Sequence, residues 1–225
     1  MKKQLLFATL GLLGAQVAQA QAQLSVGAQL GLQSTSFSAP RSYGAERQQR
    51  LGGQAGIIAN AQFNHFAIQP ALLFSQKGDK NTWREGDYAS LQSNVRLNYL
   101  ELPVNFVLST GKTEGFQLFA GPYVALGVGG RLRTTFTYLG QVEKDNGAVS
   151  FRKSSYNNPH EFRRFDAGFN VGIGHKCGPF QIQATYGASA MTITPEKQVS
   201  HMYSPRSRSI QLNLSYFLYS ASPRS

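Results

Sequence analysis

In the stretch AGIIANAQFNHFAIQPALLFS, residues 55–75, two runs of alternating residues meet at a tight turn. Every second residue from Ala55 to Phe63 is apolar, and so is every second residue from Phe66 to Phe74. Successive side chains of a β-strand point to opposite faces, so each run has one apolar face. The two-residue connection Asn64-His65 predicts that the runs form an antiparallel hairpin.

The same period of two recurs in six further segments. No segment shows apolar residues at the spacing of a helix with comparable regularity. The eight predicted strands cover residues 24–33, 54–63, 66–75, 99–108, 117–128, 165–174, 180–188 and 209–218. Their apolar faces carry no charge, and their opposite faces hold mostly Gly, Gln, Asn, Ser and Thr instead of the Lys and Glu of a water-facing strand. Strands of about ten residues with these two faces are typical of a membrane barrel, which has an apolar exterior and a polar lumen.

The connections between these segments alternate in length. The short ones are Asn64-His65, 109–115 and 177–179; the long ones are 37–50, 78–94, 131–161 and 191–206. Bacterial outer-membrane barrels have this asymmetry. The sequence therefore predicts an all-β fold, an eight-stranded antiparallel transmembrane β-barrel with short periplasmic turns and long extracellular loops. Side chains just fill the interior of a barrel of this size, so we expect a closed or very narrow lumen.

The N-terminus has the three parts of a secretory signal. Lys2 and Lys3 precede an apolar run, which ends in the small residues Ala18-Gln19-Ala20. We expect a cleaved signal peptide at residues 1–20 and a barrel domain at residues 21–225. This organisation predicts export to the outer membrane, with both termini in the periplasm.

Composition excludes several other classes of protein. The 225 residues, 41% of them hydrophobic, suffice for one domain, and no apolar run approaches the roughly 20 residues of a membrane-spanning helix. The single cysteine excludes an intramolecular disulfide framework. The formal charge is +11, of which the signal peptide carries +2. An exported basic protein is expected to meet an anionic surface, and the basic residues lack the interleaved aromatic pattern of a nucleic-acid module.

Four runs of the sequence resemble the PorT-family outer-membrane β-barrel proteins of Bacteroidota. They are GGQAGIIANAQFNHFAIQPALLFSQKG (52–78), LNYLELPV (97–104), FAGPYVALG (119–127) and RFDAGFNVGIG (164–174). The resemblance implies the same barrel fold over nearly all of the mature chain. Because the family's namesake is associated with a protein-secretion apparatus, it also implies secretion or envelope proteins as partners.

Four charged residues lie at or near the loop-side ends of the central strands: Glu101, Arg131, Arg164 and Asp166. Charges that face a narrow lumen at similar depth are expected to pair, because an isolated charge there loses its hydration. Counting outward from the short turn places Tyr123 roughly opposite Glu101, as a second partner. Two interpretations stay open for this lumen charge cluster: a gate or selectivity ring, and a polar plug.

Other constellations give weaker signals. His65, His175 and Cys177 lie near short turns, but they lack the further ligand that a metal site needs, so no metal or other cofactor is predicted. No G-x-S-x-G, H-E-x-x-H or P-loop motif is present, so the protein is expected not to be an enzyme. A hydrolase would have to combine a serine with acids and histidines of the loops, namely Asp79, Asp87, His160 and His201.

Much of the basic excess falls in or beside the predicted extracellular loops. The residues are Arg41, Arg47, Arg50, Lys80, Arg84, Arg133, Lys144, Arg152, Lys153, Arg163, Arg206 and Arg208. One interpretation is attraction to the phosphates of lipopolysaccharide, and the other is a generally solvated set of loops. The sequence thus favours a noncatalytic barrel whose loops contact surface glycolipid or partner proteins. The alternatives are an accessory part of a secretion or envelope-assembly machine, and a loop-based lipid-modifying enzyme.

Overall fold

The computed structural model describes residues 22–38, 45–86, 88–112, 114–149, 151, 162–193 and 205–221. The predicted signal peptide lies outside these residues. The strands are β1 (Gln23–Ser38), β2 (Ala45–Phe63), β3 (Phe66–Glu85), β4 (Ala89–Ser109), β5 (Gly115–Tyr138), β6 (Gln141–Ala148), β7 (Phe165–Cys177), β8 (Phe180–Thr192) and β9 (Arg206–Ala221). Within the described residues, no helix is long and apolar enough to cross a membrane.

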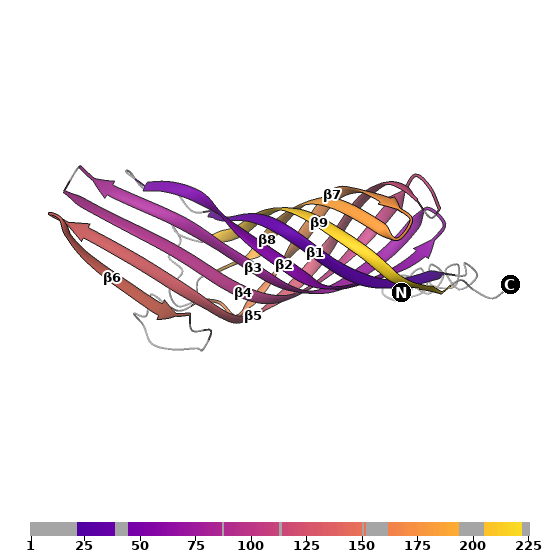
Figure 1. Ribbon diagram of the computed structural model, residues 1–225, viewed down its shortest axis with the longest axis horizontal. Coiled ribbons are helices and arrows are strands. Elements are labelled where there is room, and N and C mark those ends of the chain that lie inside the picture. The colour runs from indigo at the N-terminus through magenta and orange to yellow at the C-terminus, as the bar shows by residue number, and fades with distance from the viewer. Residues whose placement is uncertain are drawn as a thin grey trace, which may run out of the picture.

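Eight of the nine described strands close into a ring. The order is β4-β3-β2-β1-β9-β8-β7-β5, every pair is antiparallel, and a further pairing of β4 with β5 closes the ring. The remaining strand, β6, pairs with β5 beyond the ring (Figure 1). The predicted eight-stranded antiparallel barrel is therefore confirmed.

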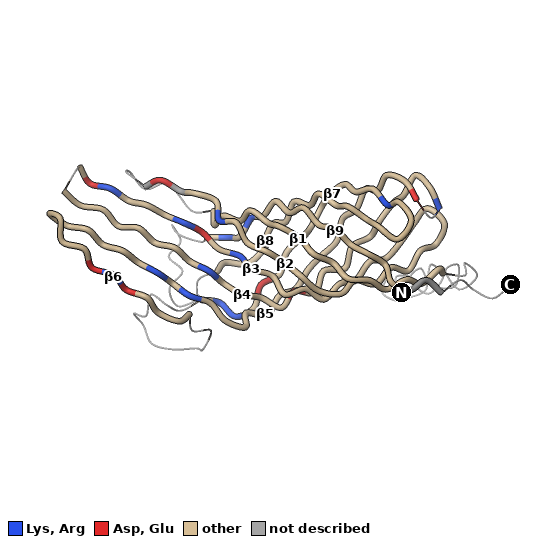
Figure 2. The backbone as a smooth tube through the Cα atoms, viewed as in Figure 1, with Lys and Arg blue, Asp and Glu red and all other residues tan. Residues whose placement is uncertain are grey.

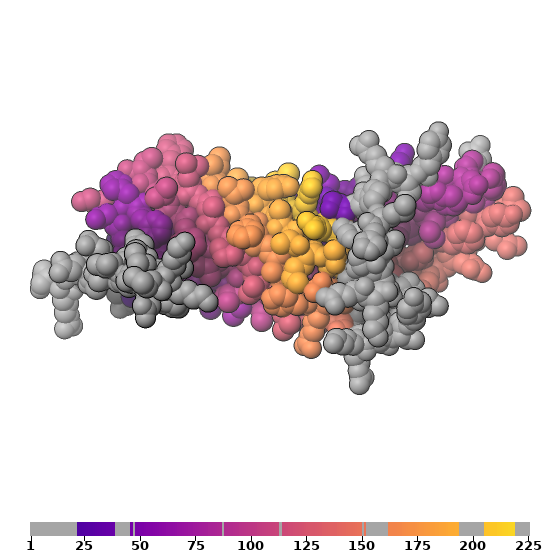
Figure 3. Space-filling model, turned by 180° about the vertical axis from the view of Figure 1, so that it is seen from behind, coloured from indigo at the N-terminus to yellow at the C-terminus, as the bar shows by residue number. Residues whose placement is uncertain are grey.

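The outer surface of the ring is an apolar belt. Its side chains come from the predicted apolar faces, and large ones such as Leu30, Leu118 and Phe169 are more than 60% exposed. The surface of β7, β8 and β9 in Figure 3 belongs to this belt. Soluble monomers do not expose apolar surface this extensive, so lipid is the medium that covers it.

The short connections form one end of the barrel. Asn64 and Gly178 adopt positive φ angles of 53° and 55° in two of these turns. Exposed aromatic side chains surround this end: the rings of Phe66 and Phe106 stack with centroids 6.3 Å apart, and Phe180 packs on Tyr216 at 4.9 Å. Aromatic side chains typically mark the membrane interface of a barrel. Strand β1 begins and β9 ends at the same end (Figure 1).

The prediction of long loops at the other end is wrong for much of their length. Strands β2 to β5 extend beyond the belt, and β6 lies within the predicted loop 131–161. Figure 1 shows the result, a sheet of β2 to β6 that projects past β7, β8 and β9. The turns lie farther out, where Gly86, Leu139 and Gly140 adopt positive φ angles. The extensions escaped the hydropathy pattern because they lie beyond the hydrocarbon of the bilayer, so their outer face carries polar residues.

One irregularity in the β4–β5 ladder changes which side chains face inward. Tyr99 pairs with Gly127 and Asn98 with Gly129, so the register shifts by one residue at Val128. Such a bulge reverses the inward and outward alternation of the strand that carries the extra residue. Beyond it, Leu132 is buried on the inner face of β5.

Candidate functional site

A buried ion-pair group lies in the part of the lumen away from the short turns. The Lys77 ammonium lies 2.7 Å from a Glu101 carboxylate oxygen and 3.6 Å from Asp166. The Tyr123 hydroxyl donates a hydrogen bond of 3.2 Å to Asp166, and the Ser189 hydroxyl donates another. All three charged side chains are at most 7% exposed. Two carboxylates around one ammonium are held together in a site from which water is nearly excluded.

Lys77 enters this group because β3 continues beyond its predicted end at Ser75. The odd-numbered residues of β3 face the lumen from Ala67 onward, and Lys77 keeps that alternation. The prediction left out Lys77 because it ended the strand at Ser75, one inward-facing position before Lys77. The signal was present, since the spacing of two from Ser75 to Lys77 to Asp79 extends the inward face.

Two predicted members of the lumen charge cluster lie elsewhere. The structure brings Glu101, Asp166 and Tyr123 together, but the side chains of Arg131 and Arg164 are exposed. The predicted partner of Tyr123 is wrong: Tyr123 lies opposite Pro103, not Glu101, and its hydroxyl donates to Asp166. Arg131 follows the bulge at Val128, which turns it to the outer face. Arg164 directly precedes β7, outside the ring. Lys77 thus supplies the positive charge that the prediction assigned to these arginines.

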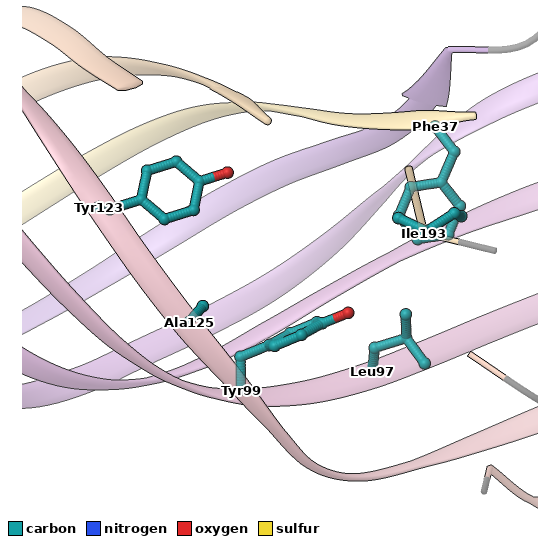
Figure 4. Close-up of a cluster of buried hydrophobic side chains, with 6 residues drawn as sticks. All are labelled: Phe37, Leu97, Tyr99, Tyr123, Ala125 and Ile193. Carbon is teal, nitrogen blue, oxygen red and sulfur yellow. The ribbon is translucent and has the colours of Figure 1, made fainter. Parts of the chain in front are cut away.

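An apolar cluster lies over the ion-pair group. Figure 4 shows its side chains directed inward from several strands: Phe37, Leu97, Tyr99, Tyr123, Ala125 and Ile193. The Lys77 ammonium lies 4.4 Å from the centre of the Tyr123 ring and 5.7 Å from that of Tyr99, so cation–π attraction links the cluster to the charge. The cluster lies inside the ring toward the end away from the short turns.

Amide side chains fill the lumen below the ion pairs. Gln181 donates hydrogen bonds to Gln117 at 2.5 Å and to Gln69 at 3.2 Å, and Gln69 donates one to Asn60 at 2.9 Å. A cavity between this layer and Glu101 has a volume of only about 10 Å³, room for about one water molecule. At this level the lumen is therefore filled by side chains.

Beyond the belt, strands β3 to β6 of the projecting sheet separate their charges by face, whereas in β2 the acidic Glu46 pairs with Thr82 and so lies on the outer face. Along β3 from Gly78, β4 before Asn98, β5 after Gly129 and all of β6, the register places every basic residue on the outer face and every acidic one on the inner face. The basic face comprises Lys80, Arg84, Arg96, Arg131, Arg133 and Lys144, and the acidic face comprises Asp79, Glu85, Glu143 and Asp145. Figure 2 shows these charges along the projecting strands.

The weaker candidate sites are not assembled among the described residues. No group of three or more His, Cys, Asp and Glu side chains could hold a metal there. His175 packs its ring against Phe116 at 4.8 Å, and Cys177 is exposed. Asp79 is buried beside the backbone amide of Phe37, at 3.5 Å. The other loop residues considered for a hydrolase, Asp87, His160 and His201, lie outside the described residues.

A closed ring with an apolar exterior and a polar interior defines the protein class as an outer-membrane β-barrel. The chain belongs to the outer membrane protein beta-barrel domain family, whose model matches residues 15–188. It is therefore an outer-membrane protein. No curated protein sequence matches the chain.

Solved structures of other barrels are similar to the chain at low sequence identity. Neisserial surface protein A is 13% identical, over 86% of this chain and 97% of that chain, with a TM-score of 0.46. Ail of Yersinia pestis, solved with the heparin analogue sucrose octasulfate, is 12% identical over 88% and 99%, with a TM-score of 0.37. OprG of Pseudomonas aeruginosa is 12% identical over 89% and 97%, with a TM-score of 0.35.

Proposed function

We propose that this protein is a noncatalytic barrel with a closed lumen, whose projecting sheet contacts glycolipid of the outer leaflet through its basic face. The observation that carries the proposal is the separation of charge on strands β3 to β6 of that sheet. Solvation by water favours neither face for basic or acidic residues. An anionic lipid surface beside the outer face favours basic residues on that face and acidic residues on the other.

The height of the basic face supports this function. It follows directly on the apolar belt, because the outward pair Leu100 and Leu126 lies four and five residues from Arg96 and Arg131. Four residues of a strand span about 13 Å, and the strand tilts from the barrel axis, so the arginines lie at head-group level. Phosphorylated glycolipid is the polyanion that an outer leaflet presents there.

We further propose that residues 1–20 are the signal peptide, that the termini and short turns are periplasmic, and that the chain is of the PorT type. The cleavage sites after Ala20 and Ala22 both leave β1 intact, because that strand begins at Gln23. N-terminal sequencing of protein extracted from outer membranes is expected to start at Gln21 or Gln23. A start at Met1 would contradict the export route.

Neutralising the basic face is expected to lower the amount of glycolipid that copurifies with the protein. A variant with Gln at all six positions should retain severalfold less phosphorylated glycolipid, measured by mass spectrometry of protein extracted in mild detergent. The control is Glu143→Gln with Asp145→Asn, which removes charge from the opposite face and should retain as much as the unmodified protein. Equal retention by all three proteins would refute the contact. Recovery of a reproducible set of secretion proteins after crosslinking would favour the accessory role instead.

The packed lumen leads us to expect no ion conduction. Purified protein in a planar bilayer should give no stepwise current, because the Lys77 ion pairs and the amide layer leave no continuous water path. A porin added to the same bilayer serves as the control for insertion and recording. Regular current steps that depend on this protein's concentration would contradict a closed lumen.

A further inference from the structure

Three arginines form a row across the outer surface of four neighbouring strands. Arg96 of β4 pairs directly with Arg131 of β5, and Gly78 of β3 pairs with Arg96 on its other side. Arg50 of β2 completes the row, because its side chain lies across Gly78 and its Nη1 donates a hydrogen bond to the Asn94 side-chain oxygen. A Cβ at Gly78 would lie 2.5 Å from Cδ of Arg50, so a glycine at this position lets the Arg50 side chain cross β3.

The arginine row, Arg50 with Arg96 and Arg131, concentrates like charges without a described acidic partner. Like charges directly opposite each other on neighbouring strands destabilise a sheet. Burial, and next the charge of Arg96, lower the pKa of Arg50. The ion pairs that Lys77 makes lie in the lumen, and among the described residues no ion pair within 4 Å involves Arg50, Arg96 or Arg131. An anion bound from outside would relieve this repulsion.

A groove runs along the row and has the size and lining of an anion site. Its volume is about 340 Å³, and its lining includes Arg50, Asn94, Arg96, Asn98, Arg131 and Arg133. Guanidinium groups bind phosphate through paired N–H donors, which gives geometric fit as well as charge. Arg133 adds a further guanidinium, which Asn146 orients by accepting a hydrogen bond of 2.8 Å from its Nε.

We propose that the arginine row binds a phosphate group of an outer-leaflet lipid, which rests on the glycolipid contact proposed above and assigns it a site. The groove lies directly beyond the apolar belt, so acyl chains packed on Leu100 and Leu126 bring the phosphate of the same lipid to the row. This continuity favours a lipid phosphate over free inorganic phosphate, which needs no apolar surface beside its site.

The test compares two variants that each lose two outward arginines. The first is Arg96→Gln with Arg131→Gln, which dismantles the row. The control is Arg206→Gln with Arg208→Gln on β9, where both side chains are exposed on the outer face beyond the belt but lie along one strand. The probe is bisphosphorylated lipid A, titrated against the mature protein in detergent micelles and measured by native mass spectrometry.

We expect the row variant to bind lipid A about tenfold more weakly, which is about 1.4 kcal/mol, and the control to bind within about twofold of the unmodified protein. Dephosphorylated lipid A should bind the row variant and the unmodified protein equally. Equal loss in both variants would overturn the row as a site but leave a diffuse glycolipid contact. Failure of the unmodified protein to bind lipid A would refute the contact itself. Full displacement of lipid A by millimolar inorganic phosphate would overturn the assignment to a lipid.

Discussion

Replacing Lys77 by methionine is expected to lower the free energy of unfolding by about 3–5 kcal/mol. The substitution leaves Glu101 and Asp166 as neighbouring carboxylates in a lumen that excludes water, with no cation to compensate them. Removing one partner of a buried pair costs this much because the remaining charge stays desolvated. Urea unfolding of the protein refolded into lipid vesicles measures the change.

Two further variants separate charge from packing. Combining Lys77→Met with Glu101→Gln should restore a large part of the loss, because the remaining Asp166 still accepts hydrogen bonds from Tyr123 and Ser189. Lys80→Met, which removes an exposed lysine of the basic face, should change the stability by less than about 1 kcal/mol. A single Lys77→Met variant as stable as the unmodified protein would show that the ion pairs do not hold the lumen together.

Placing arginine in the middle of the apolar belt is expected to cost about 2–4 kcal/mol. Phe169 is an outward residue within the apolar belt part of β7 and is 65% exposed, so Phe169→Arg places a guanidinium at a depth where lipid solvates it poorly. The matched control is Phe165→Arg at the outer end of the same strand, where head groups and water reach the charge and the cost should fall to about 0–1 kcal/mol.

The same urea titration in vesicles measures the free energy of unfolding of both variants. Each variant exchanges phenylalanine for arginine on the same strand, so the difference between their costs reports the effect of depth in the bilayer. Equal costs at the two positions would contradict the membrane placement of the belt. A larger cost for Phe165→Arg would place the bilayer midplane nearer to Phe165 than to Phe169 and so contradict the assigned depth.

The eight strands of the ring could be predicted because lipid imposes a strict pattern on them. Every second residue must be apolar where the outer face meets hydrocarbon, and that demand is visible in hydropathy alone. Beyond the belt the outer face no longer has to be apolar, and there the residues alternate in the sign of their charge. Asp79 beside Lys80, and Glu143-Lys144-Asp145, keep the period of two in their signs. The alternating signs of these charges therefore indicate strands that continue beyond the belt.

The lumen charges could be predicted wherever the alternation of inward and outward residues could be followed in the sequence. Glu101 and Asp166 stand out as charges on otherwise neutral inward faces, and Tyr123 lies on the neighbouring strand. Arg131 could not be placed, because the bulge at Val128 shifts the phase of β5 and the glycines around it carry no hydropathy signal. The arginine row could not be predicted from the sequence either, because it depends on the strand register that places Arg96 opposite Arg131.

The seam between β1 and β9 ties the beginning of the barrel to its end. The first strand in chain order gains its second neighbour only when the last one arrives, and Gln54 of β2 finds its lumen partner Gln211 on that same strand. Until then two sheet edges stay open and a row of amides lacks hydrogen-bond partners, which a bilayer does not tolerate. Insertion of this chain is thus an event of the whole polypeptide, because the ring has no closed intermediate before β9 pairs with β1.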